Sequence, residues 1–232
     1  MDVVYPYKRT ADEFELRYSL RSLVHLPHDR VIVAGDKPRI VSEGVFWAGA
    51  IPHHDRFASS TINILTAVNQ AEIVGEFIVM NDDIFVLAPW SFRHEHRGTI
   101  DEYLATAGAK GGYKRRAART RDMLKAHGVT EPLFFGLHTP TVYDAGRLID
   151  LVRQFKGERY LLRTLYHNLF PAPAARRDDV KVRQWGLASD LPDDVLSISD
   201  MCAFDPRFRA WAETRFPEPS PYEKPAITKA AA

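Results

Sequence analysis

The sequence predicts an α/β fold built on a mainly parallel sheet, and two observations carry this prediction. Short β-prone apolar runs alternate along the first 90 residues with segments whose apolar side chains recur at helical spacing. One run, Phe77 to Met80, is apolar throughout, which is typical of a strand buried on both faces of a sheet. The alternation and the buried strand together indicate layers of helices and strands around a central sheet.

The first three strands are expected early in the chain. Asp2 to Tyr5 predicts a strand that stops at Pro6, and the apolar residues of 14–24 recur at roughly helical spacing. Residues 30–34, R-V-I-V-A, predict a second strand. A third short strand is expected within residues 40–47.

The next helix and strand lead to the most informative segment of the chain. Ser59 or Ser60 is expected to cap a helix that continues to about Asn69, and the strand Phe77 to Met80 follows it. The apolar run then stops at Asn-Asp-Asp, residues 81–83, and resumes as I-F-V-L.

The adjacent carboxylates Asp82 and Asp83 are candidates for a metal site. Ligands of α/β sheets bind beyond the carboxyl ends of the strands, where this pair is expected. Neighbouring carboxylates repel each other and lose hydration there, a cost that a bound cation compensates. Oxygen ligands suit Mg²⁺ or Mn²⁺, either of which can hold the diphosphate of a nucleotide-sugar. The alternative is a hairpin, because Asn and Asp are also turn residues between strands.

The pattern changes after Trp90. Residues 91–99 are polar and rich in histidine, and residues 110–125 form a basic stretch that ends in a predicted helix. Such a stretch is typical of a solvated helix face, although beside a metal site it could also bind phosphates. The remaining expected segments are helices over 143–155, 159–170 and 206–215, a strand-like run over 196–199, and a loop over 171–179.

Composition narrows the function classes. The chain has 232 residues, a length suited to a single domain, and its formal net charge of +1 argues against a nucleic-acid-binding or membrane-surface protein. Its one cysteine, Cys202, excludes an internal disulfide framework and fits a reducing compartment. The sequence shows neither a transmembrane run nor a signal-peptide pattern, so we expect a cytoplasmic protein.

Four blocks, taken together and in order, resemble the Stealth-type sugar-phosphate transferases, a family that includes bacterial capsule polymerases and the animal N-acetylglucosamine-1-phosphotransferase. Short actinobacterial and actinophage glycosyltransferase-like proteins look closer still, through H-R-G-T and R-T-L-Y-x-N-L. The blocks are D-V-V-Y at 2–5 with E-L-R-Y-S-L-R-S-L at 15–23, M-N-D-D-I-F at 80–85, L-H-T-P at 137–140, and S-D at 199–200 with F-P-E-P-S-P-Y-E at 216–223.

Two departures from the family fall near the expected donor and acceptor pocket. The larger proteins have a W-V-D-G-S-D-like loop after the first strand, where this chain has P-Y-K-R-T at residues 6–10. Their S-H-A-I-E segment appears here as S-S-T-I-N at residues 59–63, without the His and the Glu. Transfer of a sugar and transfer of a sugar-1-phosphate therefore both stay open.

The resemblance implies a GT-A-like fold, that of nucleotide-diphosphosugar transferases, with helices on both faces of the sheet and a helical C-terminal portion. It also implies one domain over residues 1–224. Residues 1–90 would bind the nucleotide-sugar and residues 91–224 would supply the acceptor and catalytic half. Residues 225–232 are expected to be a disordered tail.

The resemblance assigns the chemistry to a few acidic residues and one histidine. Asp82 and Asp83 would bind the metal and the diphosphate, Asp83 would also count among the catalytic residues, and Asn81 would shape the turn. His138 could exchange a proton near neutral pH or contact a phosphate, and its alternative is a histidine satisfied at a strand end. Asp200 could be a catalytic base or a further metal ligand, and its alternative is a helix cap.

Basic side chains are the expected phosphate and substrate contacts. Arg17 and Arg21 lie four residues apart, hence on one helix face, and a guanidinium matches paired phosphate oxygens. Ion pairing with nearby acidic residues is the alternative for both. Arg163 is a further phosphate candidate or else a surface arginine, and His96 and Arg97 are expected in an acceptor or phosphate loop.

These expectations combine into a metal-dependent transferase with a Mg²⁺ or Mn²⁺ cofactor. It would move a sugar or a sugar-1-phosphate from a nucleotide-sugar to a glycan, polysaccharide or protein acceptor. The alternative is a non-catalytic carbohydrate- or nucleotide-binding protein that retains the fold.

Overall fold

The computed structural model describes residues 1–49, 51, 53–106, 111–186 and 191–225. Its centre is a five-stranded sheet in the order β3-β2-β1-β4-β7. Four of these strands run parallel, and the fifth, at one edge, is antiparallel to β4. The strands are β1 (Val3–Tyr7), β2 (Val31–Gly35), β3 (Phe46–Gly49), β4 (Glu76–Val79) and β7 (Thr141–Asp144).

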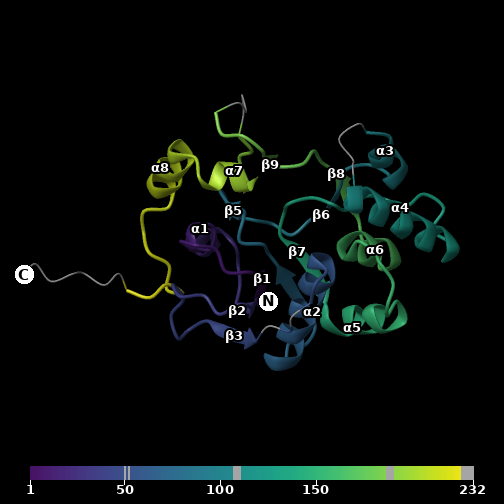
Figure 1. The fold of residues 1–232 in the computed structure, drawn as a ribbon, viewed down its shortest axis with the longest axis horizontal. Coiled ribbons are helices and arrows are strands. Elements are labelled where there is room, and N and C mark those ends of the chain that lie inside the picture. The colour runs from purple at the N-terminus through teal and green to yellow at the C-terminus, as the bar shows by residue number, and fades with distance from the viewer. Residues whose placement is uncertain (50, 52, 107–110, 187–190, 226–232) are drawn as a thin grey trace, which may run out of the picture.

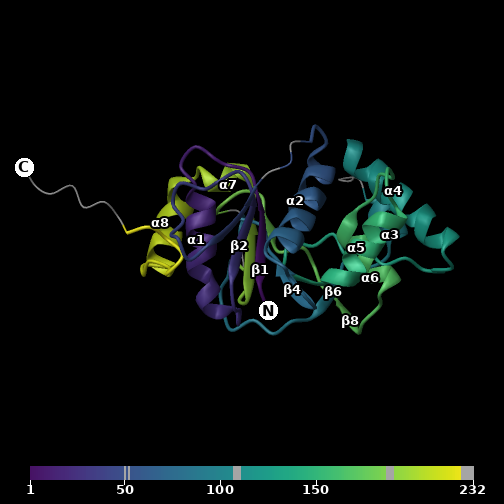
Figure 2. The same ribbon diagram turned by 90° about the horizontal axis from the view of Figure 1, so that it is seen from below.

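Helices cover both faces of this sheet, as expected. Figure 2 shows α1 (Phe14–Ser22) and α2 (Arg56–Gln70) on opposite sides of β1 and β2. Because successive strand residues point to opposite faces, Val3 packs with Leu16 of α1, whereas Val4 packs with Ile64 of α2. The all-apolar strands therefore reflect burial on both sides.

The acidic segment is not a hairpin turn. After the turn the chain enters β5 (Ile84–Val86), which pairs with β10 (Val195–Ile198) in a separate three-stranded sheet completed by β9 (Lys181–Val182). β4 pairs with β1 and β7 instead. The turn at residues 80–83 thus carries the chain from one sheet to another.

The remaining elements form two groups on either side of the sheet (Figures 1 and 2). One group contains α3 to α6 together with a two-stranded sheet of β6 and β8, and the other contains α7 and α8. Their bounds are η1 (Leu23–His25), β6 (His94–His96), α3 (Ile100–Ala105), α4 (Gly111–Ala126), α5 (Ala145–Gln154), α6 (Leu162–Leu169), β8 (Ala174–Arg176), α7 (Asp200–Ala203) and α8 (Pro206–Arg215).

Several boundaries differ from the sequence prediction. β8 lies within residues 171–179, which were predicted to be a loop, and β3 ends at Gly49, beyond the expected range 40–47. Pro6 does not end β1, because β4 pairs with β1 only at Val3 and Val4, so no ladder hydrogen bond is lost at the proline. The helix α2 is capped by Asp55, whose side chain accepts from the backbone N–H groups of residues 57 and 58, and not by a serine. Tyr143 belongs to β7, and α5 begins after it.

Other predictions hold. Residues 206–215 form α8 as expected, and residues 162–169 form α6 within the predicted helix 159–170. Within the described part of the chain, no helix combines the length and apolarity needed to cross a membrane. The expected disordered tail lies, apart from Pro225, outside the described residues.

Candidate functional site

The carboxyl ends of β1 and β4 mark the position where this sheet is built to bind a ligand. From β1 the chain continues to β2 on one side, and β4 lies on the other side, so the strand order reverses between β1 and β4. Ligands of open α/β sheets bind outside the strand ends at such a reversal. Asp82 and Asp83 follow β4 at this point.

Asp83 is held by neighbours from the second sheet. One of its oxygens, Oδ2, accepts from Nζ of Lys181 at 2.7 Å and from Oγ of Ser197 at 3.1 Å. Its other oxygen, Oδ1, is buried and has no hydrogen-bond partner among the described residues. Asp83 is therefore fixed by one oxygen and leaves the other available to a ligand.

Asp82 lies in a group of acidic residues. Burial, followed by the negative charge of Asp83, raises the pKa of Asp82 to about 7. Burial and the charges of Asp82, Asp83 and Asp200 raise the pKa of Glu15, in the first turn of α1, to about 8, against the effect of Lys181. Carboxyl groups thus gather where α1, the acidic turn and α7 meet, and burial with mutual repulsion favours their protonated forms.

These carboxylates fit a divalent cation shared with a ligand. Within the described residues, no three His, Cys, Asp or Glu side chains are arranged to hold a metal ion by themselves. Mg²⁺ commonly uses only one or two carboxylates and takes its remaining ligands from water and substrate phosphates. The free Oδ1 of Asp83 and the carboxylate of Asp82 supply that number of oxygen donors.

A cavity of about 350 Å³ adjoins the acidic turn. Three residues selected from the sequence lie in its wall: Asn81 from the turn, His138 and Arg163. The rest of the wall combines aromatic, aliphatic and hydroxyl-bearing side chains, the mixture of apolar surface and a few polar groups that is usual in small-molecule pockets. The cavity is also lined by Phe57, Tyr113, Tyr160, Val79 and Ile84.

His138 is oriented by a carboxylate that the sequence did not reveal. Its Nδ1 lies 2.9 Å from Oδ1 of Asp179, and Nη1 of Arg97 lies 3.5 Å from the other oxygen of Asp179. Burial acts against ionisation, but the hydrogen bond with His138 holds the pKa of Asp179 below its ordinary value. With a proton on Nδ1 directed at Asp179, Nε2 of His138 is left with its lone pair.

Arg163 holds the segment that carries His138. Its guanidinium donates to the carbonyls of Leu137 and Thr139 at 2.8 and 2.9 Å, and to Oγ1 of Thr139 at 2.8 Å. It is not the surface arginine considered as an alternative. Because these bonds hold the segment 137–139, we assign Arg163 a positioning role in the cavity wall, and direct substrate contact stays a prediction.

His96 and Arg97 lie close to this network. Nδ1 of His96 accepts from the backbone N–H of Gly98 at 3.0 Å, so the ring stabilises its own loop. Arg97 contacts Asp179 as described above. Asp200 is exposed in the first turn of the short helix α7, whose N-cap is Ser199, so Asp200 is not the cap itself.

Arg17 and Arg21 are bound by a carboxylate from the other end of the chain. Nη1 of Arg17 and Nε of Arg21 each lie 2.7 Å from Glu223, whose side chain is only 2% exposed. The structure therefore shows ion pairing, which was the alternative to phosphate binding. The partner, Glu223, is about 200 residues away in the sequence and was not among the nearby acidic residues considered. A phosphate would have to displace Glu223, so we leave both arginines out of the proposed site.

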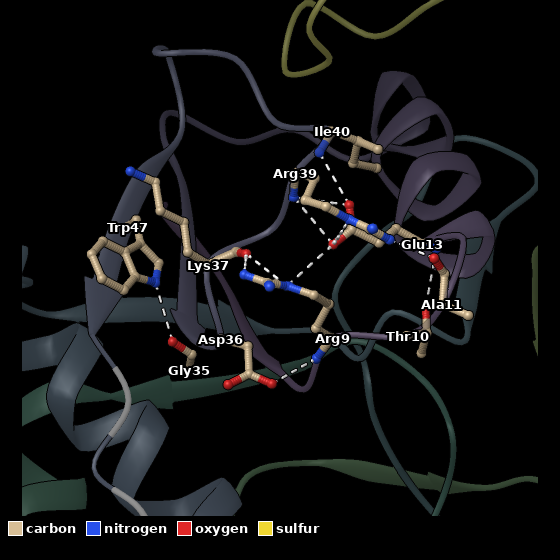
Figure 3. A network of polar contacts seen from close by, with 10 residues as sticks. All are labelled: Arg9, Thr10, Ala11, Glu13, Gly35, Asp36, Lys37, Arg39, Ile40 and Trp47. Carbon is tan, nitrogen blue, oxygen red and sulfur yellow. Dashed lines mark hydrogen bonds and ion pairs between the residues drawn. The ribbon is translucent and has the colours of Figure 1, made fainter.

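Figure 3 shows Glu13 joining the loop after β1 to the loop after β2. Its fully buried carboxylate accepts from the backbone N–H of Arg39 at 2.9 and 3.1 Å and from that of Ile40 at 3.1 Å. Arg9 extends the network by donating from Nε to the carbonyl of Lys37 at 3.1 Å. Two loops at the ligand-binding edge of the sheet are thereby fixed to each other.

Replacing Glu13 with glutamine is expected to destabilise the protein by about 2 kcal/mol, because an amide N–H₂ would then face backbone donors in a buried site. Urea denaturation of the variant measures this change. The exposed Glu43→Gln in the same region is the control and is expected to change the stability by less than about 0.5 kcal/mol. Equal stability of the two variants would contradict the role given to Glu13.

The raised pKa of Asp82 predicts a pH-dependent stability in EDTA. The pKa of Asp82 is about 7 in the folded protein and returns to the ordinary value of 3.8 on unfolding. The contribution of Asp82 to the free energy of unfolding is therefore fully present below pH 3.8 and is lost as the pH rises through 7. Asp82→Asn removes this loss. Between pH 5 and 8 the free energy of unfolding of the variant, measured by urea denaturation, should therefore rise relative to that of the wild type by about 1–3 kcal/mol. A difference that stays constant with pH would contradict the prediction.

A search of solved structures finds a crystal structure of the galactosyltransferase LgtC in complex with donor and acceptor sugar analogs. The TM-score is 0.50 at 12% identity, over 92% of this chain and 96% of that one. The fold is that of GT-A glycosyltransferases. The search also finds an active-site mutant of LgtC, with a TM-score of 0.48 and 12% identity over 92% of this chain and 95% of that one. It further finds a glycosyltransferase involved in the glycosylation of the major capsid of PBCV-1, with a TM-score of 0.43 and 11% identity over 93% of this chain and 97% of that one.

Comparisons by sequence add no family. No family model matches the chain, and no curated protein matches it. The likeness to LgtC therefore establishes the GT-A-type α/β fold, and the chemistry must be argued from the site of this chain.

Sequence reasoning missed several residues of the site. Asp179 lay in a segment interpreted as a loop, and Glu15 was recognised only as part of a family motif. Lys181 and Ser197 approach Asp83 from β9 and β10, which are distant in sequence. Only Ser197 had a local signal, since it lay in a run predicted as a strand.

Proposed function

We propose that this chain is a divalent-cation-dependent transferase that moves a sugar, or a sugar-1-phosphate, from a nucleotide-sugar to a hydroxyl group of a glycan acceptor. The observation that carries the proposal is the position of the Asp82–Asp83 pair. It stands at the strand-order reversal of a GT-A-type sheet and beside a cavity that contains a carboxylate-oriented histidine. The crystallised LgtC galactosyltransferase with donor and acceptor analogs supports the same use of the fold.

Asp82 and Asp83 would hold Mg²⁺ or Mn²⁺, which supplies neutralisation of the charge that develops on the diphosphate leaving group. Asp83 would bind through Oδ1, because Lys181 and Ser197 occupy its other oxygen. Lys181 also places a positive charge beside the acidic turn. The two carboxylates therefore have different roles, with Asp82 a ligand and Asp83 both a ligand and a link to the second sheet.

The 350 Å³ cavity would receive the acceptor. Nε2 of His138 would take the proton of the attacking hydroxyl, and Asp179 would stabilise the imidazolium that forms. Arg163 would keep the segment 137–139 in place during this step. The acceptor would thus be positioned between the histidine and the donor at the acidic turn.

The resemblance to Stealth-type transferases supports a sugar-1-phosphate as the group moved, whereas the likeness to LgtC supports a sugar. The two reactions leave different nucleotides. Transfer of a sugar releases a nucleoside diphosphate, and transfer of a sugar-1-phosphate releases a nucleoside monophosphate. Chromatography of the nucleotide product therefore separates them.

The first test is the melting temperature of the protein with a panel of nucleotide-sugars, each with Mn²⁺ or with EDTA. A donor that raises the melting temperature only with Mn²⁺ would support the proposal, since binding to the folded state stabilises it by mass action. The same donor should give no shift with Asp82→Ala. A rise in melting temperature that is the same with Mn²⁺, with EDTA and in Asp82→Ala would instead favour a non-catalytic carbohydrate- or nucleotide-binding protein.

A further inference from the structure

A second cavity, of about 690 Å³, lies beside the first and is rich in arginine. We refer to it as the arginine pocket. Four of its side chains are guanidinium groups, three from the basic helix α4 and one from the loop before α6. The arginine pocket is lined by His54, Asp55, Phe57, Gly112, Arg115, Arg116, Arg119, Gly157, Glu158 and Arg159.

Two of the four arginines are neutralised within the protein. Arg116 pairs with Asp55, the residue that caps α2, and Arg119 lies 2.6 Å from Glu158. Arg115 and Arg159 have no carboxylate within ion-pair distance among the residues that the structure describes. The arginine pocket therefore has an excess of two positive charges with histidine neutral.

The arginines are presented on a fixed frame. The buried hydroxyl of Thr120 on α4 accepts from the backbone N–H of Leu161 at 2.9 Å, which fastens the loop of Arg159 to the helix of Arg115. The guanidinium of Arg116 lies 4.4 Å from the ring centre of Phe57, which fixes α4 to the start of α2. Arg115 and Arg159 extend from this frame as exposed side chains, and guanidinium groups suit carboxylate or phosphate oxygens.

The arginine pocket is continuous with the proposed acceptor cavity. Phe57 lines both. On α4, Gly112 faces the arginine pocket and its neighbour Tyr113 faces the cavity, and in the loop before α6 the same relation holds for Arg159 and Tyr160. The acidic turn contributes Asn81 to the wall of the cavity and no residue to the arginine pocket. An anion in the arginine pocket would therefore lie beside the cavity and contact other residues than the donor diphosphate does.

We propose that the arginine pocket binds a negatively charged group of the acceptor glycan, a carboxylate or a phosphate, on a sugar next to the one that is extended. Arg115 and Arg159 are the residues that make this contact. The proposal rests on the proposed function, because it takes the cavity beside the acidic turn as the acceptor site. A glycan is favoured over a nucleic acid because the chain as a whole has a net charge of only +1.

The test uses matched charged and neutral probes. Short oligogalacturonides and their neutral methyl esters, and mannose-6-phosphate and mannose, are titrated into the wild-type protein by calorimetry at 50 and 300 mM NaCl. At least one charged probe should bind about tenfold more tightly than its neutral counterpart at low salt, and this advantage should shrink at high salt. The carboxylate pair and the phosphate pair show which anion is preferred.

Arg115→Ala combined with Arg159→Ala should remove the advantage of the charged probe. The double Lys variant should keep part of it, because the charge remains while the planar fork is lost. Arg153→Ala is the control, since Arg153 is exposed on α5 and pairs only with Asp150 at 3.8 Å. Circular dichroism confirms that each variant is folded.

Equal binding of charged and neutral probes, or an advantage that survives the double Ala substitution, would overturn the proposal. So would a single-stranded oligonucleotide that bound as tightly as the glycans through the same two arginines. Donor binding, measured on the same wild-type sample by thermal shift with Mn²⁺, is a separate readout. Anionic binding without any donor shift would refute the transferase and leave an anion site, whereas a donor shift without anionic preference would refute only the arginine pocket.

Discussion

Asp82→Asn is expected to lower kcat/KM by about 10³-fold, or about 4 kcal/mol of transition-state stabilisation, and to remove the dependence of activity on Mn²⁺. The loss follows because asparagine is a poor ligand for a hard cation, and the diphosphate then leaves without charge neutralisation. A coupled assay of nucleotide release, run across a Mn²⁺ titration, measures both effects. Wild-type activity that was unaffected by EDTA would contradict the assignment.

Asp83→Asn should give a different combination of effects, which makes it the matched comparison. Asp83 is bonded to Lys181 and Ser197, so its replacement leaves the partly buried ammonium without a charged partner. We expect the free energy of unfolding to fall by about 1–3 kcal/mol. In EDTA at pH 8, therefore, Asp82→Asn should stabilise the protein and Asp83→Asn should destabilise it.

The two carboxylates could be found from the sequence, but their different roles could not. An apolar run followed by Asn-Asp-Asp indicates a strand end with acidic side chains, and the sheet topology agrees. The role of Asp83 depends on Lys181 and Ser197, which approach it from strands almost 100 residues or more away. Local periodicity contains no information about which distant strand will pair with β5.

The same limit explains the arginines of α1. Their four-residue spacing correctly placed Arg17 and Arg21 on one face of a helix. It did not show that this face meets the C-terminal segment, where Glu223 binds both. A guanidinium suits a phosphate and a carboxylate equally well, so the residue type alone could not decide between them.

Short elements were the other difficulty. β7 is four residues long and runs directly into α5, so its apolar positions merged with the helical pattern that follows. Asp55 could have been identified as the cap of α2, since aspartate is among the preferred N-cap residues, but two serines nearby were equally suitable. Long buried strands such as β2 were predictable because burial on both faces makes them apolar throughout.

His138→Gln is expected to lower kcat by about 10²-fold to 10⁴-fold with little change in the KM for the donor, because glutamine fills the same space but cannot accept the proton. Steady-state kinetics over pH 5.5 to 9 measures this loss. His53→Gln, in an exposed loop outside the cavity, is the control and should behave as the wild type.

Asp179→Asn distinguishes a proton-transfer role for His138 from a purely structural one. Asparagine can still accept the hydrogen bond from Nδ1, at 2.9 Å in the wild type, so the ring should stay in place. It cannot stabilise the imidazolium that forms when the hydroxyl proton is taken, so kcat should fall with little change in the KM for the donor. An unchanged kcat in Asp179→Asn would show that His138 does not take the proton. The cavity would then hold its acceptor without the base that we assign to it.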